Sequence, residues 1–109
     1  MANTFKLKTK ANVGVTTVGI YTAPAATTTV VIGITMANIS GSGVNVGVGI
    51  TRAGTTEDVK LLKNAPIPQG SSLEFMAGNK VVLEATDTLT VDSDTNNSVD
   101  AALTIMEIT

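Results

Sequence analysis

The chain has 109 residues, a formal net charge of −2 and 43% hydrophobic residues, which predicts a single globular domain over residues 1–109. It contains no His, no Cys and no Trp, so the commonest proton shuttle, thiol nucleophile and soft metal ligands are absent. Only 15% of the residues are charged, which leaves no basic field to attract nucleic acid or an acidic membrane. We therefore expect a protein that is not an enzyme, holds no cofactor or metal, and binds neither nucleic acid nor membrane.

The composition also predicts self-association. Eighteen threonines and many valines favour β-structure, and the only aromatic residues are Phe5, Tyr21 and Phe75. Because aliphatic side chains bury less area than aromatic rings, we expect a marginally stable core unless subunits share surface. We therefore expect a homo-oligomer, either a dimer or a trimer.

The first predicted strand, residues 4–10, carries three lysines on one face. Phe5 and Leu7 alternate with Lys6, Lys8 and Lys10, which is the period of two that a β-strand shows. A nucleic-acid site would need more basic residues and aromatic stacking partners. We interpret the lysines as a charged edge strand that resists unwanted pairing, with docking to an acidic partner as the alternative.

Two later segments are apolar on both faces, residues 29–39 and residues 98–108. Such strands are expected to be central in a sheet or covered by a neighbouring subunit. The uncharged window Thr27 to Ile34 favours aggregation if exposed, so either the two sheets or a partner subunit must cover it. The segment Ser40 to Gly43 is interpreted as a tight connector of the hairpin type.

Glycines alternate with valines in the strand that follows this connector. Gly47 and Gly49 are expected to leave room for the close approach of another backbone or sheet. No glycine lies in a phosphate-loop context.

About eight short strands are predicted in all. They cover residues 4–10, 17–22, 28–39, 44–52, 57–63, 72–76, 80–91 (as one strand or two) and 98–108. Turn signals separate them at Pro24, at Ala53-Gly54, from Pro66 to Gly70, at Ala77 to Asn79 and from Asp92 to Asn97. Short strands at this spacing predict an all-β, antiparallel β-sandwich with a jelly roll as the leading topology.

Oxygen-bearing residues occupy alternate positions from Asp92 to Asp100, in the order Asp92, Asp94, Asn96, Ser98 and Asp100. A calcium loop of this spacing needs Gly at its sixth position and a bidentate Glu at its twelfth. Here those positions are Asn97 and Leu103. We interpret the segment as a polar turn and leave ion binding as the alternative.

Catalytic alternatives have little support in the sequence. A hydrolase would need an acid–base pair such as Glu74 with Glu84 or Asp87, and scattered carboxylates of this kind are usually solvated. A Ser–Lys pair is the other option. The few serines have no evident base near them in the sequence.

The chain resembles small virion proteins of tailed phages. The resemblance lies in YTAPAATTTVV at residues 21–31 and the following IGITMANISGSGVNVGVGI, then in Ala65 to Leu73 and in Leu83 to Leu89. It covers most of the chain and carries structural motifs, not catalytic ones. The segment FMAGNKVVL at residues 75–83 is richer in Lys and Gly than that pattern.

The resemblance implies a β-sandwich component of a virion, assembled in the host cytoplasm. The leading hypothesis is a capsid decoration or cement protein that binds across subunits of the major capsid protein and stabilises the shell. The expected partner contacts lie in the first strand, the Gly-rich turn and the proline segment: Phe5, Lys6, Lys8, Lys10, Gly41, Ser42, Gly43, Pro66, Ile67 and Pro68.

The alternative hypothesis is a neck, tail or fibre-associated virion protein, which could have a receptor-binding role. Glycan sites usually stack sugar rings on exposed aromatic side chains, and Tyr21 is the only natural candidate. We expect instead that the Tyr21 ring packs on the core, with its hydroxyl at the rim.

Overall fold

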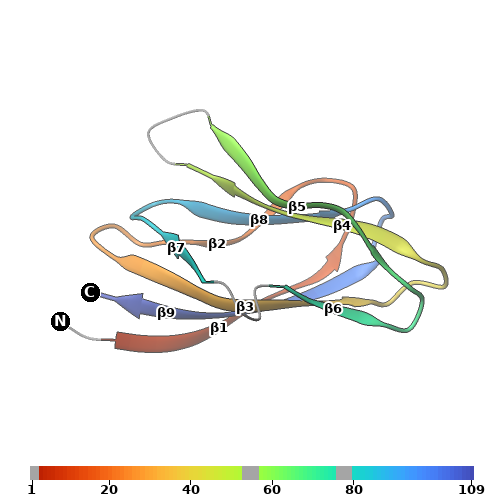
Figure 1. Ribbon diagram of the computed structural model, residues 1–109, viewed down its shortest axis with the longest axis horizontal. Coiled ribbons are helices and arrows are strands. Elements are labelled where there is room, and N and C mark those ends of the chain that lie inside the picture. Colours follow the sequence, from red (N-terminus) through yellow and green to blue (C-terminus); the bar gives the residue numbers. More distant parts are fainter. Residues whose placement is uncertain (1–2, 53–56, 76–79) are drawn as a thin grey trace.

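The computed structural model describes residues 3–52, 57–75 and 80–109, and these form two antiparallel sheets packed face to face (Figure 1). Nine strands are present in the described residues: β1 (Asn3–Val13), β2 (Val18–Thr22), β3 (Thr28–Asn38), β4 (Val44–Thr51), β5 (Asp58–Ile67), β6 (Ser72–Phe75), β7 (Val81–Leu83), β8 (Thr88–Ser93) and β9 (Val99–Ile108). Within these residues, no helix has the length and apolar character needed to cross a bilayer.

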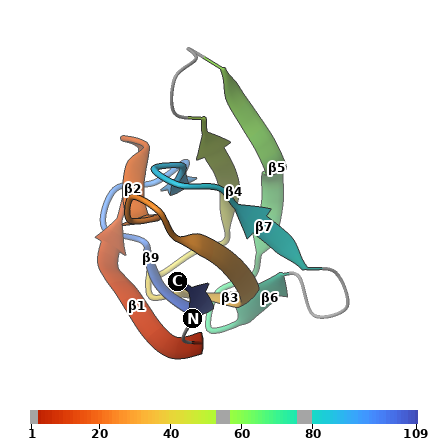
Figure 2. The same cartoon turned by 90° about the vertical axis from the view of Figure 1, so that its left-hand side faces the viewer.

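The strand order is that of a jelly roll. One sheet, here called the β1 sheet, has the order β1-β9-β3-β6, with β7 also paired with β3. The other, here called the β2 sheet, has the order β2-β8-β4-β5. Successive strands lie in different layers except for the pairs β4–β5 and β6–β7, and the resulting order is that of two Greek keys. This order confirms the predicted all-β sandwich. Figure 2 shows the start of β1 beside the end of β9, as the pairing of Asn3 with Ile108 requires.

Strands β6 and β7 together fill one position of the jelly roll. β6 pairs with the second half of β3, and β7 pairs with its first half, so both run antiparallel to the same neighbour. The predicted strand over residues 80–91 is therefore two strands, β7 and β8, and these belong to different sheets. The turn of residues 84–87 carries the chain from one layer to the other.

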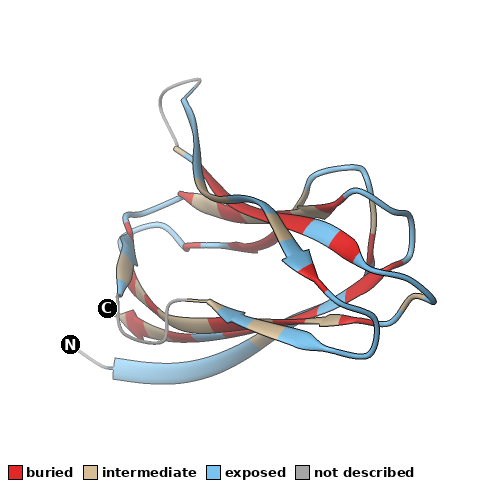
Figure 3. Cartoon of the chain, turned by 45° about the vertical axis from the view of Figure 1, so that its right-hand side comes forward, coloured by how far each residue is buried: buried red, intermediate tan, exposed pale blue. Residues whose placement is uncertain are grey.

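The core lies between the sheets and is lined by the inward-facing residues of each strand (Figure 3). In β4 the inward side chains are the predicted alternating set, Val44, Val46, Val48 and Ile50, and all are buried. β9 lies between β1 and β3, which confirms that a strand apolar on both faces is central. β3 is likewise flanked on both sides, which covers the aggregation-prone window within the sheet.

Two expectations about connections are wrong. The segment Ser40 to Gly43 is not a hairpin, because β3 and β4 lie in different sheets. Pro66 is not in a loop, because it belongs to β5 and pairs with Asn45. β5 is the edge strand of its sheet, where a residue without an N–H is tolerated. The predicted breaks at residues 53–54 and 77–79 lie outside the described residues.

Candidate functional site

The lysines of β1 lie on the side of the strand that faces the other sheet, although Lys6 and Lys10 remain exposed at this edge. Lys6 and Lys8 pair across the ladder with Ile105 and Leu103, which are core residues of β9. Phe5 and Leu7 therefore point outward, and they are 68% and 66% exposed. β1 is an edge strand, as the charged-edge interpretation expects. Its apolar residues are nevertheless the ones left open to a partner.

A buried polar cluster explains why lysines are tolerated on the inner side. The Tyr21 hydroxyl donates a hydrogen bond of 2.6 Å to Oε2 of Glu107. Oγ1 of Thr29 lies 2.8 Å from the same hydroxyl oxygen. Lys6 Nζ lies 2.9 Å from the other Glu107 oxygen, and Lys8 Nζ is 6.0 Å from the centroid of the Tyr21 ring. The cluster joins both sheets and gives Lys6 an internal partner.

The cluster shifts the titration of two groups in opposite directions. Burial, followed by the hydrogen bond to Glu107, raises the pKa of Tyr21 to about 12. The hydrogen bond from Tyr21, followed by the one from Lys6, lowers the pKa of Glu107. The neutral phenol and the ionised carboxylate thus stabilise each other. Tyr21 is buried, so its ring is not an exposed platform for a sugar.

The outward face of the β1 sheet carries an apolar row across four strands. Phe5 pairs with Met106, Met106 pairs with Val30, and Val30 pairs with Val82. Directly cross-strand residues share a face, so these side chains form one continuous ridge. Leu7 lies beside it on β1. We call these five residues the apolar ridge.

The same face is hollowed farther along the strands, where the side chains are small. A depression of about 330 Å³ is lined mainly by Thr9, Ala11, Thr35, Ala37 and Ala102. We call it the alanine–threonine hollow. In the described lengths of β3 and β9, the only outward-facing charged side chain is Asp100, at the far end of the hollow.

The outward face of the β2 sheet is polar by comparison. Thr51, Thr88, Thr90 and Asp92 point away from the core, since the residues between them are buried. Asp92 accepts a hydrogen bond of 2.9 Å from Thr17 and lies 3.6 Å from Lys60 Nζ. The two sheets of this sandwich therefore present unlike faces.

The Gly-rich turn and the proline segment lie together at one end of the molecule. Asn38, which is buried, donates from Nδ2 to the carbonyl oxygens of Ser42 at 2.8 Å and of Ile67 at 3.0 Å. Both segments are thereby tied to the end of β3. Phe5 lies toward the opposite end of that strand, because its row includes Val30.

Most residues of the predicted contact set are accessible in this arrangement. Gly41, Ser42, Gly43, Pro66 and Pro68 are exposed, as are Phe5, Lys6 and Lys10, and Lys8 is half-buried.

Ile67 is the exception in that set. It is 1% exposed because it pairs with Val44 and points into the core, so its side chain cannot meet a partner. The prediction missed Leu7, Val30, Val82 and Met106. Their signal was the apolar second face of the strands that carry them.

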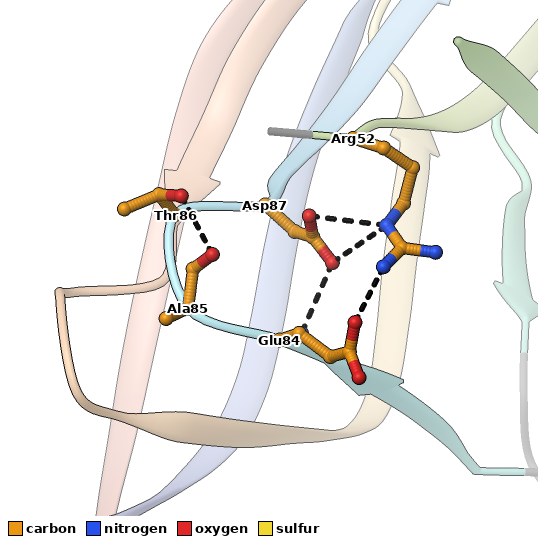
Figure 4. A network of polar contacts seen from close by, with 5 residues as sticks. All are labelled: Arg52, Glu84, Ala85, Thr86 and Asp87. Carbon is orange, nitrogen blue, oxygen red and sulfur yellow. Dashed lines mark hydrogen bonds and ion pairs between the residues drawn. The ribbon is translucent and has the colours of Figure 1, made fainter. Parts of the chain in front are cut away.

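An ion-pair network closes the other end of β4 (Figure 4). Arg52 Nε lies 3.0 Å from Oδ2 of the buried Asp87, and Arg52 Nη2 bonds the exposed Glu84. Asp87 Oδ2 also accepts the backbone N–H of Glu84 at 3.0 Å. The network fastens the turn of residues 84–87 to the end of β4. Glu84 and Asp87, the carboxylates considered for hydrolysis, are thus engaged with one guanidinium.

The carboxylates of the Asp92 to Asp100 segment go to separate partners. Asp94 Oδ1 accepts the backbone N–H of Asn45 at 3.1 Å, and Asp100 Oδ1 accepts that of Asn12 at 3.0 Å. Asp92 bonds Thr17. Within the described part of the chain, no three His, Cys, Asp or Glu residues gather as a metal site would require. The geometry is that of a turn that bonds neighbouring strands.

No model of a known protein family and no curated protein matches this sequence. Several solved structures share its fold. A chain of the T13 particle of infectious bursal disease virus superposes with a TM-score of 0.59 at 15% identity, and the match covers 96% of this chain and 30% of that one. The present chain therefore spans under a third of that viral chain.

Two further similar chains are close to this one in length. One comes from the acid-stable capsid of Helicobacter pylori bacteriophage KHP30, with a TM-score of 0.58 at 10% identity, covering 98% of this chain and 87% of that one. The other comes from the disulfide-linked pili of Bacillus endospore appendages, with a TM-score of 0.58 at 14% identity, covering 99% and 87%. At these identities the likeness establishes the jelly-roll fold.

Proposed function

We propose that this protein is a structural component of a phage virion, and that it decorates or cements the capsid without enzymatic activity. The observation that carries the proposal is a small jelly roll whose β1 sheet leaves an apolar outer face uncovered. Apolar patches larger than a few hundred Å² are uncommon on monomers and mark interaction sites. Such a face suits a protein that works inside an assembly.

The solved structures support this proposal through the fold and length of the phage KHP30 capsid chain. The pilus chain is equally similar in fold, but its pili are disulfide-linked. This sequence contains no Cys, so it cannot form that linkage. Among these assemblies, a capsid is the one whose chemistry this chain can satisfy.

The proposed mechanism is mechanical. Each copy binds across neighbouring subunits of the major capsid protein, and the area buried between them opposes the outward pressure of packaged DNA. Individual contacts can be weak, because simultaneous engagement of several subunits raises the effective affinity by about 10² to 10⁴. A low net charge fits this role, since no long-range field is needed once the partners are held in a lattice.

The proposed shell contact is the end that carries the Gly-rich turn and the proline segment. Ser42 and Pro68 are exposed there, and the Asn38 side chain bonds the carbonyls of Ser42 and Ile67. Neither segment needs to be ordered anew when a partner binds, which lowers the entropic cost of association. The edge strand β1 adds a second flank for contact.

The experiment is to compare particles assembled with and without the protein. Quantitative mass spectrometry should find copies in numbers comparable to the major capsid protein, and particles lacking it should release DNA at a lower temperature. Ser42→Arg and Pro68→Arg should reduce incorporation, whereas Ala85→Arg, at the opposite end of β4, should not. Unchanged incorporation of both the Ser42→Arg and Pro68→Arg variants would show that this end of the molecule does not contact the shell.

The number of copies per particle also distinguishes capsid decoration from the second candidate role, that of a neck, tail or fibre-associated protein. The exposed Phe5, Leu7 and Val82 would serve equally in a neck, tail or fibre-associated protein that packs against its neighbours. Such a protein would be present at only a handful of copies per particle. Immunogold label confined to one vertex of the particle would contradict capsid decoration and support the neck, tail or fibre role.

A further inference from the structure

The outer face of the β1 sheet is unpartnered, and its relief is uneven along the strands. At the end near the chain termini stands the apolar ridge, and at the other end lies the alanine–threonine hollow. We propose that a second copy of this chain covers this face, in a two-fold dimer that seats each ridge in the hollow of the other copy. The dimer forms in solution and does not require the particle.

The ridge supplies the side chains that would be inserted. Phe5, Leu7 and Val82 are 68%, 66% and 55% exposed, and they stand on the same face as Met106 and Val30 through the in-register ladder. Burying large apolar side chains of this kind is the main source of association energy. No segment within the described residues covers them.

The hollow supplies a surface of matching character. It is lined mainly by small side chains. A second depression of about 400 Å³ shares Thr35 and Ala102 with it and is also lined by Ile32, Glu74 and Phe75. The methyl groups of alanine and threonine make this surface apolar without projecting far. Lys10 and Asp100 stand at the rim of the hollow, which gives the polar margin around an apolar centre that protein interfaces show.

Two-fold symmetry brings the ridge and the hollow together. Consider a two-fold axis that lies midway between two facing β1 sheets, parallel to their planes and perpendicular to their strands. Rotation about it reverses the strand direction, so the ridge of one copy lies over the hollow of the other. The axis would pass near Thr104, which lies between Met106 of the ridge and Ala102 of the hollow. An isologous contact requires this kind of self-complementary face.

The face is large enough for a stable dimer. β3 and β9 have 11 and 10 residues. With about 3.3 Å per residue and about 4.8 Å between strands, four strands give a face of roughly 600 Å² per copy. Two copies would bury roughly 1,200 Å², at the lower edge of the range for specific interfaces.

Charge is sparse on the face, which favours a like partner over an unlike one. A partner recognised by charge would need complementary groups, and in the described lengths of β3, β6 and β9 the outward-facing charged residues are Asp100 and Glu74, which lies on the edge strand β6 opposite Thr35. When the partner is a second copy, both contacting faces are apolar, and water is excluded from both. The other sheet, with its threonines and Asp92, remains in solvent.

The first test is the mass of the purified protein in solution, measured by light scattering and sedimentation up to roughly 100 µM. We expect twice the mass of the chain. Phe5→Lys on the ridge and Ala102→Lys in the hollow should each weaken dimerisation by at least about tenfold, because each places a charge in the buried centre. The matched control Thr51→Lys, on the outer face of the β2 sheet, should leave the dimer intact.

The readouts distinguish failure to fold from failure to dimerise. Each variant is first compared with the parent chain by its unfolding midpoint in urea at high protein dilution, where both are monomers. A monomeric parent chain over the whole concentration range would overturn the proposal. So would a trimer, or a dimer that survives both the ridge and hollow variants. None of these outcomes depends on whether the capsid role is correct.

Cross-linking tests the position of the axis. Sheets that pack face to face lie about 10 Å apart, too far for a disulfide between facing backbones, so a short bismaleimide is used on single-cysteine variants. The parent chain has no Cys, which leaves one reactive site per copy. In the Thr104→Cys variant, the cysteine of one subunit should cross-link to the same cysteine of the second subunit. In the Thr90→Cys variant, whose cysteine lies on the other sheet, no cross-link should form. Equal cross-linking of both would contradict the proposed face.

Discussion

Tyr21 of the β2 sheet and Glu107 of the β1 sheet are joined by a 2.6 Å hydrogen bond, although they lie 86 positions apart in the chain. The phenol proton goes to the carboxylate, so Thr29, at 2.8 Å from the phenol oxygen, acts as the donor in its own bond to Tyr21. Lys6 bonds the second carboxylate oxygen. One buried acid therefore connects β1, β2 and β9, and through Tyr21 it also reaches β3.

Tyr21→Phe should destabilise the fold. The substitution keeps the ring in the core but removes the donor to Glu107 and leaves the Thr29 hydroxyl without this partner. Loss of a buried hydrogen bond to a charged group costs about 1–3 kcal/mol. Urea denaturation should show a lower midpoint with an unchanged slope. Thr22→Val, which removes the exposed hydroxyl pair with Thr88, should change stability by less than half as much.

Stability should fall at both ends of the pH scale because of this pair. The pKa of Glu107 is lowered by folding, so the unfolded chain binds protons first on acidification and stability decreases as the pH falls below about 4.3, the ordinary Glu value. The pKa of Tyr21 is raised from 10.0 to about 12. The unfolded chain then loses its proton first, and stability decreases as the pH rises from 10 toward 12.

The variant Glu107→Gln tests how much this carboxylate contributes to the loss of stability at acid pH and at alkaline pH. It should remove this residue's contribution to the acid-side loss of stability, and it should reduce the alkaline-side loss as well, because the carboxylate contributes to the raised pKa of Tyr21. Unfolding free energies measured across the pH range provide the comparison. An unchanged acid limb in this variant would show that other carboxylates dominate acid unfolding.

Gly49→Ala should be far more damaging than Gly41→Ala. A Cβ at Gly49 would lie 2.9 Å from the backbone oxygen of Val59 and 3.2 Å from Oγ1 of Thr90. Strand β5 would have to move away from β4, and overpacking of this kind costs about 1–3 kcal/mol. A Cβ at Gly41 meets nothing within 4 Å. Thermal unfolding of the two variants checks the contrast, and equal midpoints would contradict it.

The two carboxylates that bind Arg52 should differ in importance. Asp87→Ala removes a buried acceptor of the Arg52 side chain and of the Glu84 backbone N–H, and should cost about 1–3 kcal/mol. Glu84→Ala removes a partner whose side chain is 72% exposed, and exposed pairs contribute about 0–1 kcal/mol. Chemical denaturation measures both. A larger loss from the Glu84 variant would contradict this ranking.

Local patterns predicted the strands because a period of two depends only on neighbouring residues. The alternation of Val44, Val46, Val48 and Ile50 is enough to define a strand with one buried face. In the same way, glycines between these valines indicated a close backbone approach. The carbonyl oxygens of Leu62 and Val59 lie 3.2 Å and 2.9 Å from the positions that Cβ atoms at Gly47 and Gly49 would take, so the approaching backbone is that of the neighbouring strand β5.

Local patterns could not assign strands to sheets. The turn Ser40 to Gly43 looks like a hairpin in sequence, yet it crosses between layers because β3 pairs with β9 and β4 pairs with β8. Ile67 next to two prolines looks like a loop residue, yet it pairs with Val44 in the core. These outcomes depend on contacts between distant segments, whose energies no short stretch of sequence contains.

The all-β class, the extent of most strands and the absence of cysteine chemistry follow from residue type and local spacing, and could therefore be predicted before the fold was known. The outward side of β1 could not be predicted in this way, because it depends on contacts with distant strands. A strand with lysines on one face and Phe5 and Leu7 on the other suggests that the apolar side is buried. Glu107 and Tyr21 reverse that choice, because their buried polar atoms stabilise Lys6 at the core margin and leave the apolar side for another molecule.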